Sequence, residues 1–166
     1  MAARRLVVLA LAALMLTFLP STSADNSLQS ANTLTEGVSV SGQVCYDDGC
    51  SPTDETDWWR VYAYKGDIVS ISFSGTLPNP DWLCIWGDGW EGDYSIHDSN
   101  GGQIASLALS DDNPTGTLSK TMSKADWVYV KIKGKDSWCN DAIDYTLTAS
   151  IDSNDRDTDE DGYIDT

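Results

Sequence analysis

The chain has 166 residues and a formal net charge of −16, with 26 acidic side chains against ten lysines and arginines. This balance argues against nucleic acid and against anionic lipid surfaces as partners, because both require clustered basic residues. It leaves cation binding, solubility in salty surroundings and simple solvation of the surface as reasons for the charge. Beyond its N-terminal segment the chain holds about 140 residues, the size of one ordinary domain.

Residues 1–24 have the pattern of a secretory signal peptide. Arg4 and Arg5 precede an apolar run over residues 6–19, and small residues follow at 21–24. The run is short for a membrane span, so cleavage is favoured over a retained N-terminal anchor. We therefore expect a secreted or cell-surface protein without membrane insertion after cleavage, with a polar lead-in over residues 25–36.

Four cysteines remain after export, and an even number in a secreted chain predicts two disulfides. A local bridge between Cys45 and Cys50 across a tight turn would leave Cys84 to pair with Cys139. All three connectivities stay open at this point. A metal site of four thiolates is disfavoured, because paired CxxC spacing is missing and the compartment is wrong for it.

Segments in which apolar and polar residues alternate follow one another from residue 37 to residue 151. The first predicts a strand over 37–46. The next two, 58–64 and 69–74, flank a short Lys-Gly-Asp turn at 65–67 and predict a β-hairpin. Alternation places one side of each strand on the core. We expect the core-facing residues here to be Trp59, Val61, Ala63, Val69, Ile71 and Phe73.

Six further strands are expected, at 82–86, 94–98, 104–109, 117–122, 127–132 and 145–151. The turn at 99–102 predicts a hairpin, and 117–122 reads as an edge strand. No segment after the signal peptide shows a helical period with caps. Eight or nine short strands separated by Gly, Pro, Asn and Asp predict an all-β protein, an antiparallel β-sandwich over residues 37–151.

The segment 154–166 carries the strongest chemical signal, the pattern D-x-D-x-D-G-x-x-D. Calcium takes roughly six to eight oxygen ligands. Alternate carboxylates can turn toward one centre, and the glycine at 162 permits the sharp turn. In an EF-hand-type register the ligands would be Asp157, Asp159, Asp161, the backbone carbonyl of Tyr163, and Asp165.

The last ligand of such a register falls beyond Thr166, so we expect residues 152–166 to be a truncated repeat of a longer protein. The alternative is an acidic tail that is merely solvated. The alternate spacing and the glycine in register favour calcium. A second metal site would be Asp54, Glu55 and Asp57, although a turn whose aspartates accept backbone N–H bonds is favoured there.

Two tryptophans are candidates for stacking on a carbohydrate: Trp90 in a glycine-rich acidic loop, and Trp58 at the start of a strand. Trp82 and Trp86 share one face of a short strand, which is more typical of a core. Catalysis has little support. His97 is the only histidine, no serine lies in a G-x-S-x-G elbow, and nothing selects a carboxylate pair for glycoside hydrolysis. We therefore expect a protein that is not an enzyme.

The stretch TDWWRVYAYKGDIVSISFSG resembles the opening of the bacterial and archaeal pre-peptidase C-terminal domain family. YSIHDSNGGQIASL resembles its middle hairpin, and ADWVYVKIKG with DYTLTASI resembles its last two strands. The resemblance spans roughly residues 32–151 and implies a jelly-roll-like β-sandwich. It also implies a usually non-catalytic domain of secreted proteins, often beside peptidases, that sometimes binds polymeric substrates or calcium. The acidic tail is similar to thrombospondin type 3 repeats.

Together these features predict a secreted, non-catalytic β-sandwich module with a C-terminal calcium-binding repeat. We expect it to act as an extracellular adhesion, spacer or substrate-binding element, with calcium as ligand and an extracellular polysaccharide or protein as candidate partner. The alternatives are a carbohydrate-binding module and an accessory domain of a secreted peptidase.

Overall fold

The computed structural model describes residues 26–45, 55–76, 91–110, 112–135 and 142–159, together with 161 and 164. The strands are β1 (Asn32–Thr33), β2 (Ser39–Cys45), β3 (Thr56–Ala63), β4 (Ile68–Thr76), β5 (Glu91–His97), β6 (Gln103–Ser110), β7 (Thr115–Thr121), β8 (Asp126–Gly134) and β9 (Ala142–Asp152). The predicted signal peptide and the predicted strand at 82–86 lie outside the described residues.

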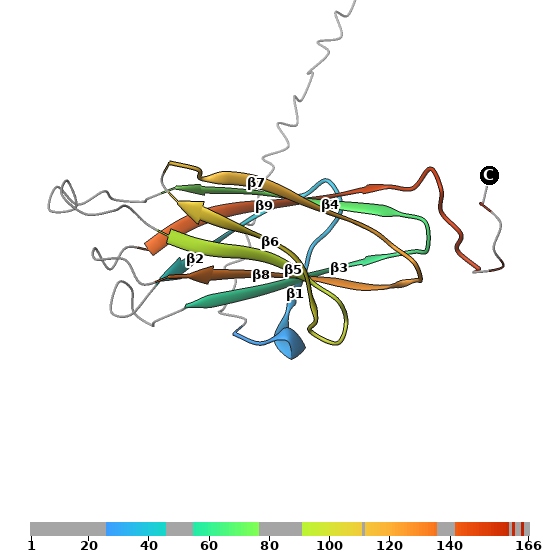
Figure 1. Ribbon diagram of the computed structural model, residues 1–166, viewed down its shortest axis with the longest axis horizontal. Helices are drawn as coiled ribbons and strands as arrows, with labels where there is room; N and C mark the ends of the chain where they lie inside the picture. Colours follow the sequence, from blue (N-terminus) through green and yellow to red (C-terminus); the bar gives the residue numbers. More distant parts are fainter. Residues whose placement is uncertain are drawn as a thin grey trace, which may run out of the picture.

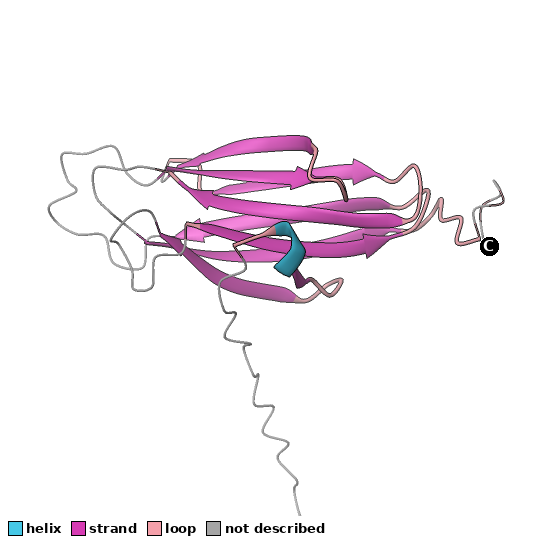
Figure 2. Ribbon diagram, turned by 90° about the horizontal axis from the view of Figure 1, so that it is seen from below, coloured by secondary structure: helices cyan, strands magenta, loops and turns pink. Residues whose placement is uncertain are grey.

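The strands form two sheets that stack as two layers (Figures 1 and 2). Sheet A has the order β1-β3-β8-β5-β6, and sheet B has the order β2-β9-β4-β7. The predicted all-β sandwich is confirmed. One pair departs from the antiparallel expectation, because β1 in the predicted lead-in runs parallel to β3. The helical element of the described part is a 3-10 turn, η1 (Leu28–Ser30), and no helix there is long and apolar enough to cross a membrane.

The core lies between the two sheets and is built from the alternating faces that the sequence predicts. Trp59, Val61 and Ala63 of β3 are at most 3% exposed, and Val69, Ile71 and Phe73 of β4 face them with similar burial. The inner face of β8 and that of β9 complete it with Val128, Val130, Ile132, Tyr145, Leu147 and Ala149. A period of two therefore assigned the core side of each of these strands correctly.

The predicted hairpin of β3 and β4 is wrong, because these strands lie in different sheets. β3 pairs with β8, whereas β4 pairs with β7 and β9. The turn at residues 64–67 thus carries the chain from one layer to the other. A hairpin and such a crossing show the same alternation in sequence. They differ in whether the two apolar faces lie side by side in one sheet or oppose each other across the core.

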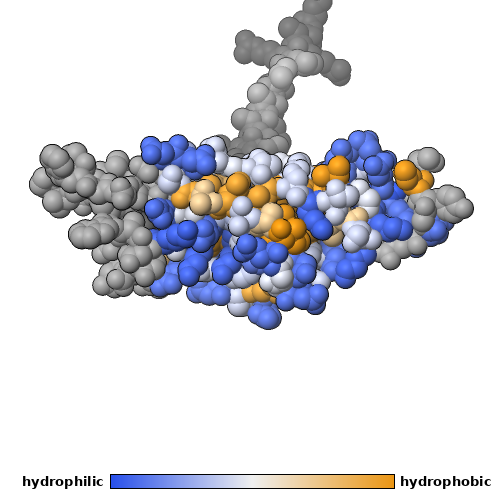
Figure 3. Space-filling model, viewed as in Figure 1, coloured by the Kyte–Doolittle hydropathy of each residue, from blue (hydrophilic) through white to orange (hydrophobic). Residues whose placement is uncertain are grey.

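Two other predictions about neighbouring strands are confirmed. β5 and β6 form a hairpin, and β7 is an edge strand of sheet B. Leu107 on β6 reaches over Gly116 on β7, where a Cβ would lie 2.6 Å from its Cδ1 atom. Hydrophobic side chains therefore gather over the middle of this side of the molecule, in the region of β6 (Figure 3). Ile104, near the start of β6, is 37% exposed.

Candidate functional site

The turn between β3 and β4, residues 64–67, is stabilised by hydrogen bonds of its last residue, Asp67. The amide of Asp67 donates to the carbonyl of Tyr64 over 3.2 Å, and the amide of Tyr64 donates back to Asp67 Oδ2 over 2.9 Å. Gly66 has a φ of +88°, a conformation that costs a residue with a Cβ about 1–2 kcal/mol. The turn is thereby closed by two hydrogen bonds at one end of the sandwich.

The acidic C-terminal segment leaves β9 at this same end of the sandwich and docks on the turn (Figure 1). The amide of Asp157 donates to the carbonyl of Lys65 over 2.8 Å, which forms an isolated antiparallel bridge. The two backbones are so close that a Cβ on Gly66 would lie 1.6 Å from the carbonyl oxygen of Asp155. The glycine is therefore needed for docking as well as for the turn.

Two ion pairs fasten the segment to the turn. Arg156 donates from Nε to Asp67 Oδ1 over 2.9 Å and from Nη2 to Asp67 Oδ2 over 3.2 Å, and the carboxylate is fully buried. The guanidinium also lies 5.0 Å from the centre of the Tyr64 ring. Lys65 Nζ lies 2.8 Å from Asp157 Oδ2, and Asp157 is 4% exposed. Each residue of the turn thus contacts the segment that carries the acidic motif.

Three of the predicted calcium ligands come together. One carboxylate oxygen from each of Asp157, Asp159 and Asp161 lies within 4.8 Å of the others. The amide of Asp161 donates to Asp159 Oδ1 over 3.2 Å, which keeps these two residues in one curl of the chain. Asp157 is buried and the other two are exposed. Tyr163 and Asp165, the remaining predicted ligands, lie outside the described residues.

The contacts that anchor this segment to the turn were not predicted from the sequence. The hydrogen bonds between Arg156 and Asp67 join residues 89 positions apart, and the pair of Lys65 and Asp157 spans 92 positions. Contacts at such separations leave no local pattern, because neither partner alters the alternation around it. The sequence does contain one sign of this contact. The charges of the turn, Lys-Gly-Asp, are complementary to those of the tail, Arg-Asp.

The two described residues of the predicted second metal site, Asp57 and Glu55, differ in burial. Asp57 faces the core and accepts a short hydrogen bond from the Tyr145 hydroxyl, which in turn accepts from Trp59 Nε1 over 2.9 Å. Glu55 is exposed, and Asp54 lies outside the described residues. The buried Asp57 therefore takes part in a hydrogen-bonded group that links β3 to β9.

His97 lies on β5 beside Ser95, with 2.9 Å between Ser95 Oγ and His97 Nε2. Its Nδ1 lies 3.1 Å from the carbonyl oxygen of Gly101, which can only accept, so the neutral imidazole carries its proton on Nδ1. Burial lowers the pKa of His97, and the nearby Lys131 lowers it further against the bond to Gly101. In the described structure a backbone carbonyl thus occupies the place that a carboxylate holds in a serine–histidine–aspartate triad.

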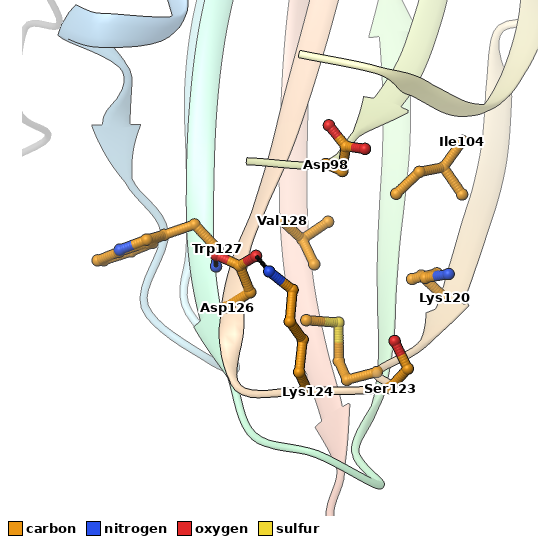
Figure 4. A pocket seen from close by; sticks show the side chains of 9 residues that line it. Asp98, Ile104, Lys120, Ser123, Lys124, Asp126, Trp127 and Val128 are labelled. Atoms are coloured by element: carbon orange, nitrogen blue, oxygen red, sulfur yellow. Dashed lines mark hydrogen bonds and ion pairs between the residues drawn. The ribbon is translucent and has the colours of Figure 1, made fainter. Parts of the chain in front are cut away.

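A hollow of about 210 Å³ lies between the strand ends of the two sheets (Figure 4). Lys124 reaches Asp126 over 2.8 Å, and Asp126 also accepts from Ser99 over 2.7 Å. Burial raises the pKa of Asp126, but these hydrogen bonds outweigh it and lower the pKa overall. Asp98 accepts from the backbone amides of its own turn. The acidic groups of this hollow are therefore engaged within the protein.

Two sets of predicted residues are described only in part. Cys45 is completely buried at the end of β2, and the other three cysteines lie outside the described residues, so their pairing stays a prediction. Trp58 is half-buried on β3, with its ring centre 5.0 Å from that of His97. Trp90 lies outside the described residues.

No protein-family model and no curated protein matches the chain. The fold is similar to the pre-peptidase C-terminal domain of a collagenase from Bacillus anthracis, with 15% identity, a TM-score of 0.47, and coverage of 72% of this chain and 94% of that one. It is also similar to PliG from Aeromonas hydrophila, a periplasmic inhibitor of g-type lysozyme, with 11% identity, a TM-score of 0.42, and coverage of 74% and 97%. The first belongs to the family that the sequence resembles.

Proposed function

We propose that the protein is a secreted, non-catalytic β-sandwich module whose C-terminal acidic loop binds calcium. In this role it serves as an extracellular adhesion, spacer or substrate-binding element. The observation that carries the proposal is the convergence of Asp157, Asp159 and Asp161, whose carboxylate oxygens lie within 4.8 Å of one another. Calcium–oxygen distances are about 2.3–2.6 Å, so two oxygens on one ion can be about 5 Å apart. The observed spacing is therefore compatible with a single ion.

The docking of the loop on the sandwich supports the same proposal. Asp157 is placed by its backbone bond to Lys65, and its neighbour Arg156 is fixed by Asp67. The first ligand of the loop thus has a defined position before any ion binds, which reduces the entropy that binding must overcome. Lys65 holds the Asp157 carboxylate in place through an ion pair of 2.8 Å. Magnesium is less suited, because it demands near-ideal octahedral geometry and keeps its water.

Calorimetric titration of the secreted chain with calcium, after treatment with a chelator, tests the proposal. We expect heat of binding for the unchanged protein and a large loss of affinity in Asp159→Asn and Asp161→Asn. Both residues are exposed, so these variants should fold normally. Asp112→Asn, which removes an exposed carboxylate elsewhere, is the matched control and should bind as the unchanged protein does. Equal affinity in all four proteins, or no binding in any, would refute calcium binding by this loop.

A further inference from the structure

The outer face of sheet A gathers aromatic and cationic side chains in the middle of the sheet. The pairing of β3 with β8 places Trp58 opposite Lys131, Arg60 opposite Tyr129 and Tyr62 opposite Trp127. These positions alternate with the core residues of both strands, so they lie on the face away from the core. Tyr129 is nevertheless buried on that face, at 8% exposed, whereas the other five residues are at least partly exposed. We name this set the aromatic–cationic strip: Trp58, Arg60, Tyr62, Trp127, Tyr129 and Lys131.

Contacts within the strip hold the rings and the charges together. The ammonium of Lys131 lies 5.4 Å from the Trp58 ring centre, and the guanidinium of Arg60 lies 4.6 Å from that of Trp127. Tyr62 packs edge-on against Trp127, with 5.2 Å between ring centres. A cation–π contact fixes the position of a cation but does not neutralise its charge. Both charges therefore remain able to attract an anion.

The charge of this face is opposite to that of the whole chain, which is −16. Among the described residues neither Arg60 nor Lys131 takes part in an ion pair. Two acidic side chains, Asp93 and Glu91, lie toward one end of the face, and Asp93 is paired there with Lys135 over 3.0 Å. The centre of the strip is thus a positively charged region on an acidic protein. Electrostatic complementarity favours an anionic partner there.

A polar hollow of about 230 Å³ adjoins the strip on β5, β6 and β8. Lys131 belongs to its lining, together with Lys133, and Gln103 Nε2 donates there to Ser106 Oγ over 3.2 Å. The hollow therefore combines hydroxyl, amide and ammonium groups with the His97 imidazole, beside the Trp58 ring. The Asp93 carboxylate also lines it, and that carboxylate is paired with Lys135. Hydrogen-bonding groups next to an aromatic platform are what a sugar requires, because its ring has an apolar face and a rim of hydroxyls.

We propose that the aromatic–cationic strip binds a polysaccharide that carries carboxylate groups. The chain lies along β3, its sugar rings stack on Trp58 and Trp127, and its carboxylates pair with Lys131 and Arg60. From Trp58 to Tyr62 the strand advances four residues, or about 13 Å, which accommodates a short oligosaccharide. An acidic peptide without rings, such as poly-glutamate, would pair with the charges but would not stack on the aromatic side chains. This surface is separate from the acidic loop, so its function does not depend on calcium.

Affinity electrophoresis and tryptophan fluorescence with three polymers test the proposal, using the secreted chain in the presence of a chelator. The polymers are polygalacturonate, which has carboxylates on sugars, neutral dextran, and poly-glutamate. We expect binding to polygalacturonate with a change in fluorescence, little binding to dextran, and at least about tenfold weaker binding to poly-glutamate. Absence of binding to polygalacturonate, or equal binding of either other polymer, would overturn the proposal.

Variants assign the binding to the strip. Lys131→Gln and Arg60→Gln should each weaken binding of polygalacturonate about tenfold or more, because each removes a charge-assisted hydrogen bond. Lys120→Gln, on β7 in sheet B, changes the net charge equally and should leave the affinity unchanged. Trp58→Leu should weaken binding even at high salt, where charge pairs are screened. Thermal unfolding midpoints establish that each variant is folded, and an equal loss in Lys120→Gln would refute the assignment.

Discussion

Arg156 holds the buried carboxylate of Asp67 with two hydrogen bonds, of 2.9 and 3.2 Å, and thereby ties the C-terminal segment to the turn between β3 and β4. Asp67 is fully buried, whereas the side chain of Arg156 is 31% exposed. A carboxylate in such a position needs its partner, because a buried charge without compensation is costly. This contact therefore connects the stability of the sandwich to the position of the acidic loop.

The first prediction concerns the removal of this guanidinium. Arg156→Met should lower the free energy of unfolding by about 2–3 kcal/mol, somewhat less than for a fully dry pair, because Arg156 is partly exposed. Lys124→Met is the control, since it removes an ion pair whose lysine is 66% exposed, and it should cost below about 1 kcal/mol. Urea unfolding measures both. Equal costs in the two variants would show that Asp67 does not depend on Arg156.

The second prediction separates docking of the tail from strain in the turn. Gly66→Ala should be strongly destabilising, because the φ of +88° is unfavourable for alanine and the new Cβ would lie 1.6 Å from the Asp155 carbonyl oxygen. Gly101→Ala shares the positive φ, at +83°, but its Cβ would meet only a leucine methyl at 3.6 Å. We expect about 1–2 kcal/mol for that control.

If Gly66→Ala destabilises the protein no more than Gly101→Ala does, the close approach of the tail is not a feature of the folded state. Proteolysis offers a second measurement. Undocking of residues 155–157 should make cleavage after Arg156 faster in Gly66→Ala than in Gly101→Ala, because a protease needs a locally free backbone.

The third prediction rests on the proposed calcium site and concerns Lys65, whose ammonium lies 2.8 Å from Asp157 Oδ2. Lys65→Gln should raise the affinity for calcium several-fold at low salt, because a positive charge near a cation site opposes binding. The backbone bond from Asp157 to the carbonyl of residue 65 is retained in this variant. Calorimetry is the measurement, with Lys124→Gln as control. A weaker affinity would instead mean that Lys65 orients the carboxylate.

The fourth prediction is a pH dependence due to His97. Because burial lowers its pKa in the folded state, the unfolded chain, whose histidine has a pKa of about 6.5, binds the proton more readily. The free energy of unfolding should therefore decrease as the pH falls below about 6.5 toward the lower pKa of the folded state. Urea midpoints at several pH values measure the effect. His97→Gln should show a smaller loss on acidification, and an identical loss would contradict the prediction.

The sequence by itself determined the β-sandwich class and the core-facing side of β3, β4, β8 and β9. A strand with one dry face must alternate, and that period can be read locally, as for Trp59, Val61 and Ala63. It also identified the three aspartates that converge in the tail, because their spacing is local as well. Turn residues at 99–102 identified the hairpin of β5 and β6 for the same reason.

Only the tertiary structure decided which strands are neighbours. The turn at residues 64–67 crosses between the sheets instead of closing a hairpin, and that choice depends on which apolar faces oppose each other across the core. The contacts of Arg156 with Asp67 and of Lys65 with Asp157, and the alignment of β3 with β8 that creates the aromatic–cationic strip, join residues far apart in the chain. Local periodicity carries no information about pairing at such distances, because each strand satisfies its own alternation whichever partner it takes.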